Sequence, residues 1–362
     1  MAFLFFRKKM YKLALYKTTT FMSNRKQLLP LLAIVFVGMF AFSCKKSSNK
    51  GTTASGVYIV GDIEPYNPGQ PMPILWKDGV PTDLSNGKGG NATSIFIYGN
   101  DVYVGGTLSD SISYTPVIWK NGTPLIQQLL NPSDVGSVMD VCVQDVNTYA
   151  CGSIYTPGKG SYYAVYWVNE AIKPLPSGPG NATSIAISGN DVYVGGYLTD
   201  TLSSLNSFPV IWKNGNIIFT DTAHGQINSI YINGNDVYAA GSLNTNTTVP
   251  VLWKNGIPTI LYANGGNANH VFVKNGDVYV SGDAYYAATA KDIAMVWKNG
   301  ATTTLVGLGY PGIVKASAML NNDFYSVSNR YDILYTSMIL WKNGQESVVD
   351  SSYGNVWDIA VK

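Results

Sequence analysis

The feature that most constrains this chain is an eight-residue stretch, "GNDVYVGG", found at Gly99–Gly106 and again, unchanged, at Gly189–Gly196. Related copies read "GNDVYAAG" at Gly234–Gly241 and "NGDVYVSG" at Asn275–Gly282. A second marker, usually "WKNG", follows each copy. Its tryptophans are separated by 43, 48, 45, 41, 44 and 44 residues, and they are Trp76, Trp119, Trp167, Trp212, Trp253, Trp297 and Trp341. A repeat of this length built from short β segments is typical of propeller blades.

Each repeat carries four strand signals, which the second copy shows most clearly. They are Ala92–Ile97, the "DVYVGG" stretch, Pro116–Trp119 and Thr123–Ile126. The Gly-Asn between the first and second strands and the Lys-Asn-Gly between the third and fourth are hairpin turn signals, because such turns need residues that accept positive φ. The pattern therefore predicts a four-stranded antiparallel unit.

Residues that recur once in every unit are interpreted as scaffold rather than as a site. Asp101 recurs with its turn, so we expect it to serve the turn and not to act as a catalytic acid. Gly106 has a counterpart in all copies but one, where Ser328 stands instead. A glycine inside a strand suits a bulge or a close backbone approach. The repeated tyrosines and tryptophans are interpreted as packing.

The two ends of the repeat array predict a closed ring. The first unit begins directly at its second strand, Gly56–Gly61, and the chain ends with an unpaired first strand, Asn355–Lys362. We expect the C-terminal strand to complete the N-terminal blade, which removes exposed sheet edges. The predicted fold is all-β: a seven-bladed β-propeller of four-stranded blades over residues 56–362.

The unit resembles the blades of kelch-type proteins and of the central domain of galactose oxidase, in which an apolar strand ends in Gly-Gly and a tryptophan closes a later strand. The tyrosine that usually stands six residues before that tryptophan is missing, and the "WKNG" turn differs. The "VYVGG…WKNG" pattern also resembles uncharacterised lipoproteins of the Bacteroidetes type. These resemblances imply a propeller and transfer no functional residue to this chain.

The N-terminal segment is predicted to be a secretory signal. Arg25 and Lys26 precede an apolar run, Leu28–Phe42, which ends just before Cys44. The stretch "AFSC" resembles a bacterial lipoprotein signal, which implies a lipid anchor on Cys44. We interpret residues 1–21 as an over-called start, 22–43 as the signal peptide and 44–55 as a tether. The alternative is a transmembrane anchor, but the run is shorter than the roughly 20 residues that span a bilayer. The expected location is the cell envelope, at the periplasmic or surface side of the outer membrane.

The charge of the body argues against a nucleic-acid partner. Residues 1–43 contain seven of the 24 basic residues and no acidic one, which leaves 17 bases against 22 acids, a net charge of −5. Nucleic-acid binding requires a basic surface that neutralises phosphates. Cys142 and Cys151 remain after Cys44 is set aside. A two-residue turn at Asp145-Val146 would place these cysteines diagonally on adjacent strands, a poor disulfide geometry, so buried free thiols are expected.

Two places are predicted to carry function. The first is the face formed by the loops between the second and third strands and between successive units (the B–C/D–A face), because these loops vary while the other turns do not. Tyrosine combines a flat apolar ring with one hydroxyl, which suits recognition of sugars or peptides. The candidate ligand-binding tyrosines are Tyr66, Tyr114, Tyr155, Tyr162, Tyr163, Tyr197, Tyr285, Tyr286 and Tyr331.

The second place is the central channel, which the first strand of each unit should line. One register reads Ser94, Asp140, Ser184, Ser229, His270, Ala316 and Asp358, and the register before it reads Thr93, Met139, Thr183, Asn228, Asn269, Lys315 and Trp357. These side chains vary while their neighbours stay apolar, as expected for a pocket. Its ionisable candidates are Asp140, His270, Lys315 and Asp358.

The first functional hypothesis is a membrane-anchored, monomeric, non-enzymatic binding module that holds a glycan or an envelope protein on its tyrosine-rich face. The second is a hydrolase or lyase with a pocket at the channel mouth. The third is a structural envelope scaffold. We predict no metal and no cofactor, because no nucleophile motif, phosphate loop or Cys/His ligand spacing is present in the sequence.

Overall fold

The structure is a computed structural model of the chain, and it describes residues 56–64, 70–110, 113–200, 202, 206–303, 311–331 and 336–362. The predicted signal peptide, Cys44, the predicted tether and Tyr66 lie outside these residues. The described elements are 27 strands and one short 3-10 helix, η1 (Pro157–Lys159). Across this part of the chain, no helix is long and apolar enough to cross a bilayer.

The strands form antiparallel sheets in which neighbours along the chain are hydrogen-bonded neighbours in space. Three four-stranded sheets come from the N-terminal and C-terminal parts of the chain. The first contains β27 (Gly354–Val361), β1 (Val57–Ile63), β2 (Met72–Lys77) and β3 (Val80–Asp83). The second contains β4 (Gly89–Tyr98), β5 (Asp101–Ser109), β6 (Tyr114–Lys120) and β7 (Thr123–Ile126). The third contains β23 (Ile313–Leu320), β24 (Asp323–Tyr331), β25 (Thr336–Lys342) and β26 (Gln345–Asp350).

Two further four-stranded sheets come from the middle of the chain. One contains β15 (Gly225–Asn233), β16 (Asp236–Asn244), β17 (Thr248–Lys254) and β18 (Ile257–Ile260). The other contains β19 (Gly266–Lys274), β20 (Asp277–Tyr286), β21 (Lys291–Lys298) and β22 (Ala301–Thr302). The predicted strands of the second repeat coincide with β4 to β7, each extended by at most a few residues.

The remaining strands form one seven-stranded sheet, which the sequence did not predict. It contains β8 (Val135–Gln144), β9 (Asn147–Thr156), β10 (Ser161–Val168), β11 (Ala171–Ser188), β12 (Asp191–Thr199), β13 (Ser207–Lys213) and β14 (Asn216–Thr220). The long strand β11 pairs with β10 through its first part and with β12 from Gly180 onward. It therefore serves as the last strand of one repeat and the first strand of the next.

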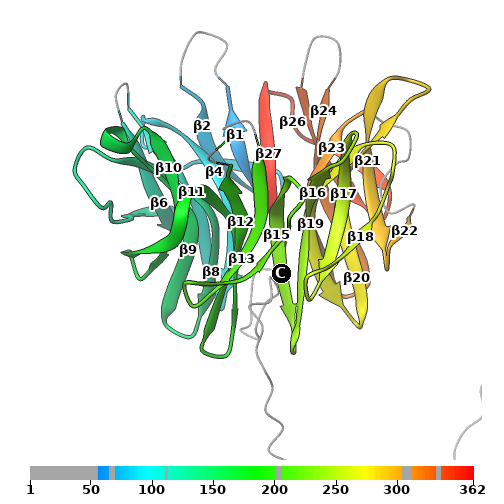
Figure 1. Cartoon of the computed structure of the whole chain (residues 1–362). Helices are drawn as coiled ribbons and strands as arrows, with labels where there is room; N and C mark the ends of the chain where they lie inside the picture. The colour runs from blue at the N-terminus through cyan, green and yellow to red at the C-terminus, as the bar shows by residue number, and fades with distance from the viewer. Residues whose placement is uncertain are drawn as a thin grey trace, which may run out of the picture. The chain divides into compact units, whose positions relative to one another are not determined.

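The first strand of each repeat contacts the first strand of the following repeat: β4 contacts β8, β8 contacts β11, and so on through β15, β19, β23 and β27 to β4. The C-terminal strand β27 pairs antiparallel with β1, with Tyr58 opposite Ala360, and Figure 1 shows the two strands side by side in red and blue. The all-β architecture of four-stranded antiparallel sheets is consistent with a β-propeller.

The hydrophobic cores lie between neighbouring sheets. One cluster joins Val60 of β1 and Ala360 of β27 with Ile95 of β4 and the Trp119 side chain of β6. The tryptophan of every repeat is at most 2% exposed, as expected for packing residues. Burial of such large side chains is the main favourable term for a sheet that has apolar residues on both faces.

The recurring turns are tied together by the residues that repeat with them. Asn121 adopts a φ of 50°, its Oδ1 accepts a hydrogen bond from Val102 N at 2.9 Å, and its Nδ2 donates to Asp101 Oδ1 at 2.8 Å. Lys120 Nζ lies 3.0 Å from Asp101 Oδ2. The hydrogen bonds from Asn121 and Lys120 hold the pKa of Asp101 below its usual range. The interpretation of Asp101 as a turn residue is confirmed.

Candidate functional site

Each first strand carries an irregularity in its pairing with the second strand. In β4 the pairing with β5 shifts register between Ala92 and Ser94, which leaves Thr93 as the extra residue. The same shift occurs in β8, β11, β15, β19, β23 and β27. A bulge of this kind re-aims the side chains beside it. Two consecutive positions of each first strand therefore line one common pocket.

The recurring glycine of the second strand exists because of this bulge. A Cβ placed on Gly106 would lie 2.0 Å from the carbonyl oxygen of Asn91, and one on Gly282 would lie 1.9 Å from that of Asn267. At Gly106 and Gly282 the two backbones therefore approach too closely for a residue that has a Cβ atom. In the sheet of β23 and β24, Ser328 takes this position, and its hydroxyl accepts a hydrogen bond from Trp341 Nε1 at 2.8 Å.

The structure brings the two predicted registers together at one small pocket of about 90 Å³. All fourteen side chains of these registers line it, including Asp140, His270, Lys315 and Asp358. They come from seven first strands, β4, β8, β11, β15, β19, β23 and β27. Sequence reasoning located this pocket because the bulge repeats with the same period as the strands.

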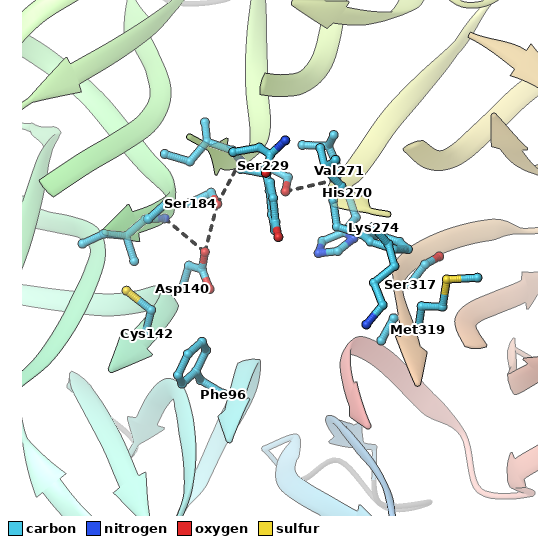
Figure 2. A pocket seen from close by; sticks show the side chains of 18 of the residues that line it. Phe96, Asp140, Cys142, Ser184, Ser229, His270, Val271, Lys274, Ser317 and Met319 are labelled. Atoms are coloured by element: carbon cyan, nitrogen blue, oxygen red, sulfur yellow. Dashed lines mark hydrogen bonds between the residues drawn. The ribbon is translucent and has the colours of Figure 1, made fainter. Parts of the chain in front are cut away.

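Both oxygens of the Asp140 carboxylate accept hydrogen bonds, and these come from its own strand and from neighbouring strands. Its Oδ1 accepts from Ser94 Oγ at 2.6 Å and from Val141 N at 2.9 Å. Its Oδ2 accepts from Ser184 Oγ at 2.9 Å and from Ile185 N at 3.1 Å, contacts that Figure 2 draws around Asp140 and Ser184. A carboxylate has about four lone-pair sites. Asp140 therefore joins β4, β8 and β11, and it has no remaining site for a ligand hydrogen bond.

Asp358 makes a comparable link between β27 and β4. Its Oδ2 accepts from Ile95 N at 2.9 Å and its Oδ1 accepts from Ile359 N at 2.9 Å. The hydroxyls of Ser184 and Ser229 accept from the backbone N–H groups of Ile230 and Val271 in the same manner. These contacts connect each first strand to the next, which is a structural role for two of the predicted ligand residues.

Among the residues predicted to line the pocket, Lys315 has surroundings that are unusual for a lysine. Its ammonium lies 4.8 Å from the centre of the Trp357 ring. Burial lowers the pKa of Lys315, and the nearby charge of Asp283 partly opposes this shift. Asp283 follows the bulge-facing Gly282 and is 2% exposed. Burial first, and the Asp292 charge second, raise the pKa of Asp283 to about 6.

Sequence reasoning missed Asp283 and also its counterpart Asp62. The Asp62 side chain accepts hydrogen bonds from Trp357 Nε1 and from Asn91 Nδ2, and burial raises its pKa. Both acids follow a repeat glycine, so the signal that could have found them is the position after that glycine. The other repeats place uncharged residues there: Thr107, Ser153, Tyr197, Ser242 and Asn329.

The predicted tyrosines are spread over several sheets. Tyr114, Tyr285, Tyr286 and Tyr331 are exposed on β6, β20, β20 and β24, and burial raises the pKa of Tyr331. Tyr155 packs against Tyr162, with ring centroids 5.1 Å apart, and the Lys159 ammonium lies 4.7 Å from the Tyr163 ring centre. Tyr155 and Tyr163 thus make local packing contacts within their own hairpin.

Tyr162 and Tyr197 do come together, in a groove of about 440 Å³ between β10 and β12. The Tyr197 hydroxyl accepts from Asn181 Nδ2 at 2.6 Å, and burial raises the pKa of Tyr197. Among the residues that the structure describes, no charged side chain lines this groove. Its lining residues are Gly160, Ser161, Tyr162, Pro179, Asn181, Tyr197, Thr199, Asn206, Ser207 and Gln226.

Cys142 and Cys151 are buried free thiols, as expected. Cys142 pairs with Tyr149 and Cys151 with Asp140, the register that the Asp145-Val146 turn predicts. Within the described ranges, no group of three or more His, Cys, Asp and Glu side chains is arranged to hold a metal ion. No family model matches this chain, and comparison with curated proteins finds no significant match. Its function is therefore argued from its own geometry.

Proposed function

We propose that this chain is a seven-bladed β-propeller, closed by β27, that acts as a non-enzymatic binding module for a neutral glycan. The proposed ring is supported by the contacts that run from each first strand to the next and by the pairing of β27 with β1. In this arrangement β11 belongs to two adjacent blades. The groove between Tyr162 and Tyr197 is the binding site.

The observation that carries the proposal is the composition of this groove. Its described lining combines two tyrosine rings with uncharged amide and hydroxyl groups. Neutral sugars offer apolar ring faces and many hydroxyls, so aromatic rings and uncharged hydrogen-bonding groups complement them. Because the Tyr197 oxygen already accepts from Asn181, its own proton is left for a ligand acceptor.

We further propose that the molecule acts at the cell envelope, as a monomer held by a lipid on Cys44. The support is the apolar run before that cysteine and the polar tether after it. An envelope protein bound at the same face is the alternative ligand, and a purely structural scaffold is the alternative without a small ligand.

One observation favours the enzyme alternative. Asp283, whose pKa is raised to about 6, interacts electrostatically with Lys315, whose pKa is lowered and which lines the small pocket. Perturbed pairs of this kind occur at catalytic sites. However, Asp140 and Asp358 are occupied by structural hydrogen bonds, which leaves a hydrolase without two of its four candidate residues.

The test is a binding screen of the full chain against neutral oligosaccharides of the cello, malto, laminari and xylo series. Each hit is measured again with Tyr162→Ala and with the control Tyr114→Ala, since both tyrosines are 52% exposed. Loss of binding in the Tyr162 variant alone supports the groove. Equal binding by both variants, or no hit together with capture of an envelope protein, would refute it.

A further inference from the structure

A second cavity lies in the channel on the other side of the Asp140–His270 level, toward the turns that join first and second strands. It has a volume of about 210 Å³, and Figure 2 shows the side chains that line it. Asp140, Ser184, Ser229 and His270 border both this cavity and the channel-mouth pocket. Function was predicted on the opposite face, and no sequence pattern indicated this cavity.

The walls of this cavity combine polar side chains with several large apolar ones. Phe96 and Met319 contribute from β4 and β23, and Phe272 contributes from β19, where its ring is stacked on Tyr279 with centroids 5.0 Å apart. A cavity of roughly 150 Å³ with apolar walls can bind benzene. The present cavity has room for one such ring and a single polar substituent.

The polar groups of the cavity favour a ligand that accepts hydrogen bonds. Asp140 has its acceptor sites filled by four donors. The Ser229 hydroxyl accepts from Val271 N at 3.3 Å, which leaves its own proton available. At this end of the cavity Ser229 therefore offers a donor and Asp140 has no open acceptor site. The negative charge of Asp140 opposes an anion beside it, so an anionic group belongs at the opposite end.

Lys274 supplies the one ammonium among the side chains that line this cavity. In Figure 2 it extends from β19 toward the open middle of the pocket, on the side of Met319. Among the residues that the structure describes, it makes no ion pair or hydrogen bond. By contrast, Lys362 Nζ is committed to Gly99 O and to Asn100 Oδ1. The repeat lysines, such as Lys120, are committed to their turn aspartates.

We propose that this cavity binds a small monocarboxylate with a flat apolar body, its ring between Phe96 and Phe272 and its carboxylate on the Lys274 ammonium. The charge-assisted hydrogen bond to Lys274 is the strong contact, and the volume of about 210 Å³ excludes larger solutes. This site is independent of the glycan groove, which lies on other strands.

The test uses the full chain with labelled methionine methyl groups, observed by NMR during titration with benzoate. The Met319 methyl lines the cavity, whereas Met139 lines the channel-mouth pocket and serves as the internal control. We expect benzoate to shift the Met319 signal and leave that of Met139 unchanged. Uncharged benzamide should bind roughly tenfold or more weakly, because it lacks the charge-assisted contact.

Two variants separate anion recognition from simple cavity filling. Lys274→Gln should weaken benzoate binding by about tenfold, while the exposed-lysine control Lys88→Gln should not change it. Lys274→Glu should reverse the preference, so that benzylammonium binds and benzoate does not. Equal affinity for benzoate and benzamide, or no shift of Met319 with any of these compounds, overturns the proposal. Retained glycan binding in the Lys274 variants would show that the two sites are separate.

Discussion

At the scale of single residues, Asp140 illustrates how a carboxylate in a pocket can be structural. Replacing it by Asn converts one acceptor into a donor, which then faces the Ser184 hydroxyl and the Ile185 N–H. We expect Asp140→Asn to lower the free energy of unfolding by about 2–4 kcal/mol, measured by urea denaturation. The control Asp145→Asn, at an exposed turn position with a φ of 55° that Asn also accepts, should be nearly neutral. Unchanged stability together with loss of a chemical activity would instead favour the enzyme hypothesis.

The raised pKa of Asp283 predicts that the free energy of unfolding depends on pH. The pKa of this carboxyl is 3.8 in its ordinary state and about 6 in the folded chain. Between these values the folded state binds more protons than the unfolded state, so the free energy of unfolding falls as the pH rises from about 4 to 6. Asp283→Asn should remove this slope and stabilise the protein at pH 7 by about 1–3 kcal/mol. A thermal melt series from pH 4 to 7 measures it.

The matched control for this prediction is Asp292→Asn. The Asp292 charge is the second cause of the raised pKa of Asp283, after burial. Its removal should therefore give the same sign of change with a smaller magnitude. If the stability of Asp283→Asn still falls as the pH rises, another titratable group causes the pH dependence.

At the scale of the strand pair, the bulge in the first strand requires the glycine that faces it on the second strand. Gly106→Ala places a Cβ against the Asn91 carbonyl, so we expect a loss of about 3 kcal/mol or a shifted register. Gly158→Ala is the control, because a Cβ there meets no atom within 4 Å. Urea denaturation of the two variants compares them directly. If both variants were equally stable, the close approach at Gly106 would be wrong.

At the scale of the whole molecule, β27 is expected to hold the array of sheets together. It pairs with β1, contacts β23 and β4, and buries Val356 and Ile359. Replacing Gly354–Val361 by a Gly/Ser segment of equal length should lower the melting temperature by roughly 10 °C or more, because several buried side chains and a sheet partner are lost together. Calorimetry measures the change. Adding the 354–361 peptide should restore part of it, whereas an unaltered melting temperature would contradict closure by β27.

The local architecture of this protein follows from the residues of each repeat. The strands β4 to β7, the turn role of Asp101, the glycine facing a bulge and the register of Cys142 opposite Tyr149 were all predictable. Each depends on residues within one hairpin, where alternation and positive-φ turn residues specify pairing. The channel-lining register was predictable for the same reason, since it repeats in step with the strands.

The roles of these positions, by contrast, depend on contacts between different repeats. Asp140 is occupied because Ser94 and Ile185 lie some 45 residues away on either side, in neighbouring repeats. The raised pKa of Asp283 depends on burial and on a charge from the adjacent strand β21. The groove at Tyr162 and Tyr197 and the cavity at Lys274 are spaces left between strands. The size and shape of such spaces depend on side chains from several repeats together, so they cannot be read from the sequence of any one repeat.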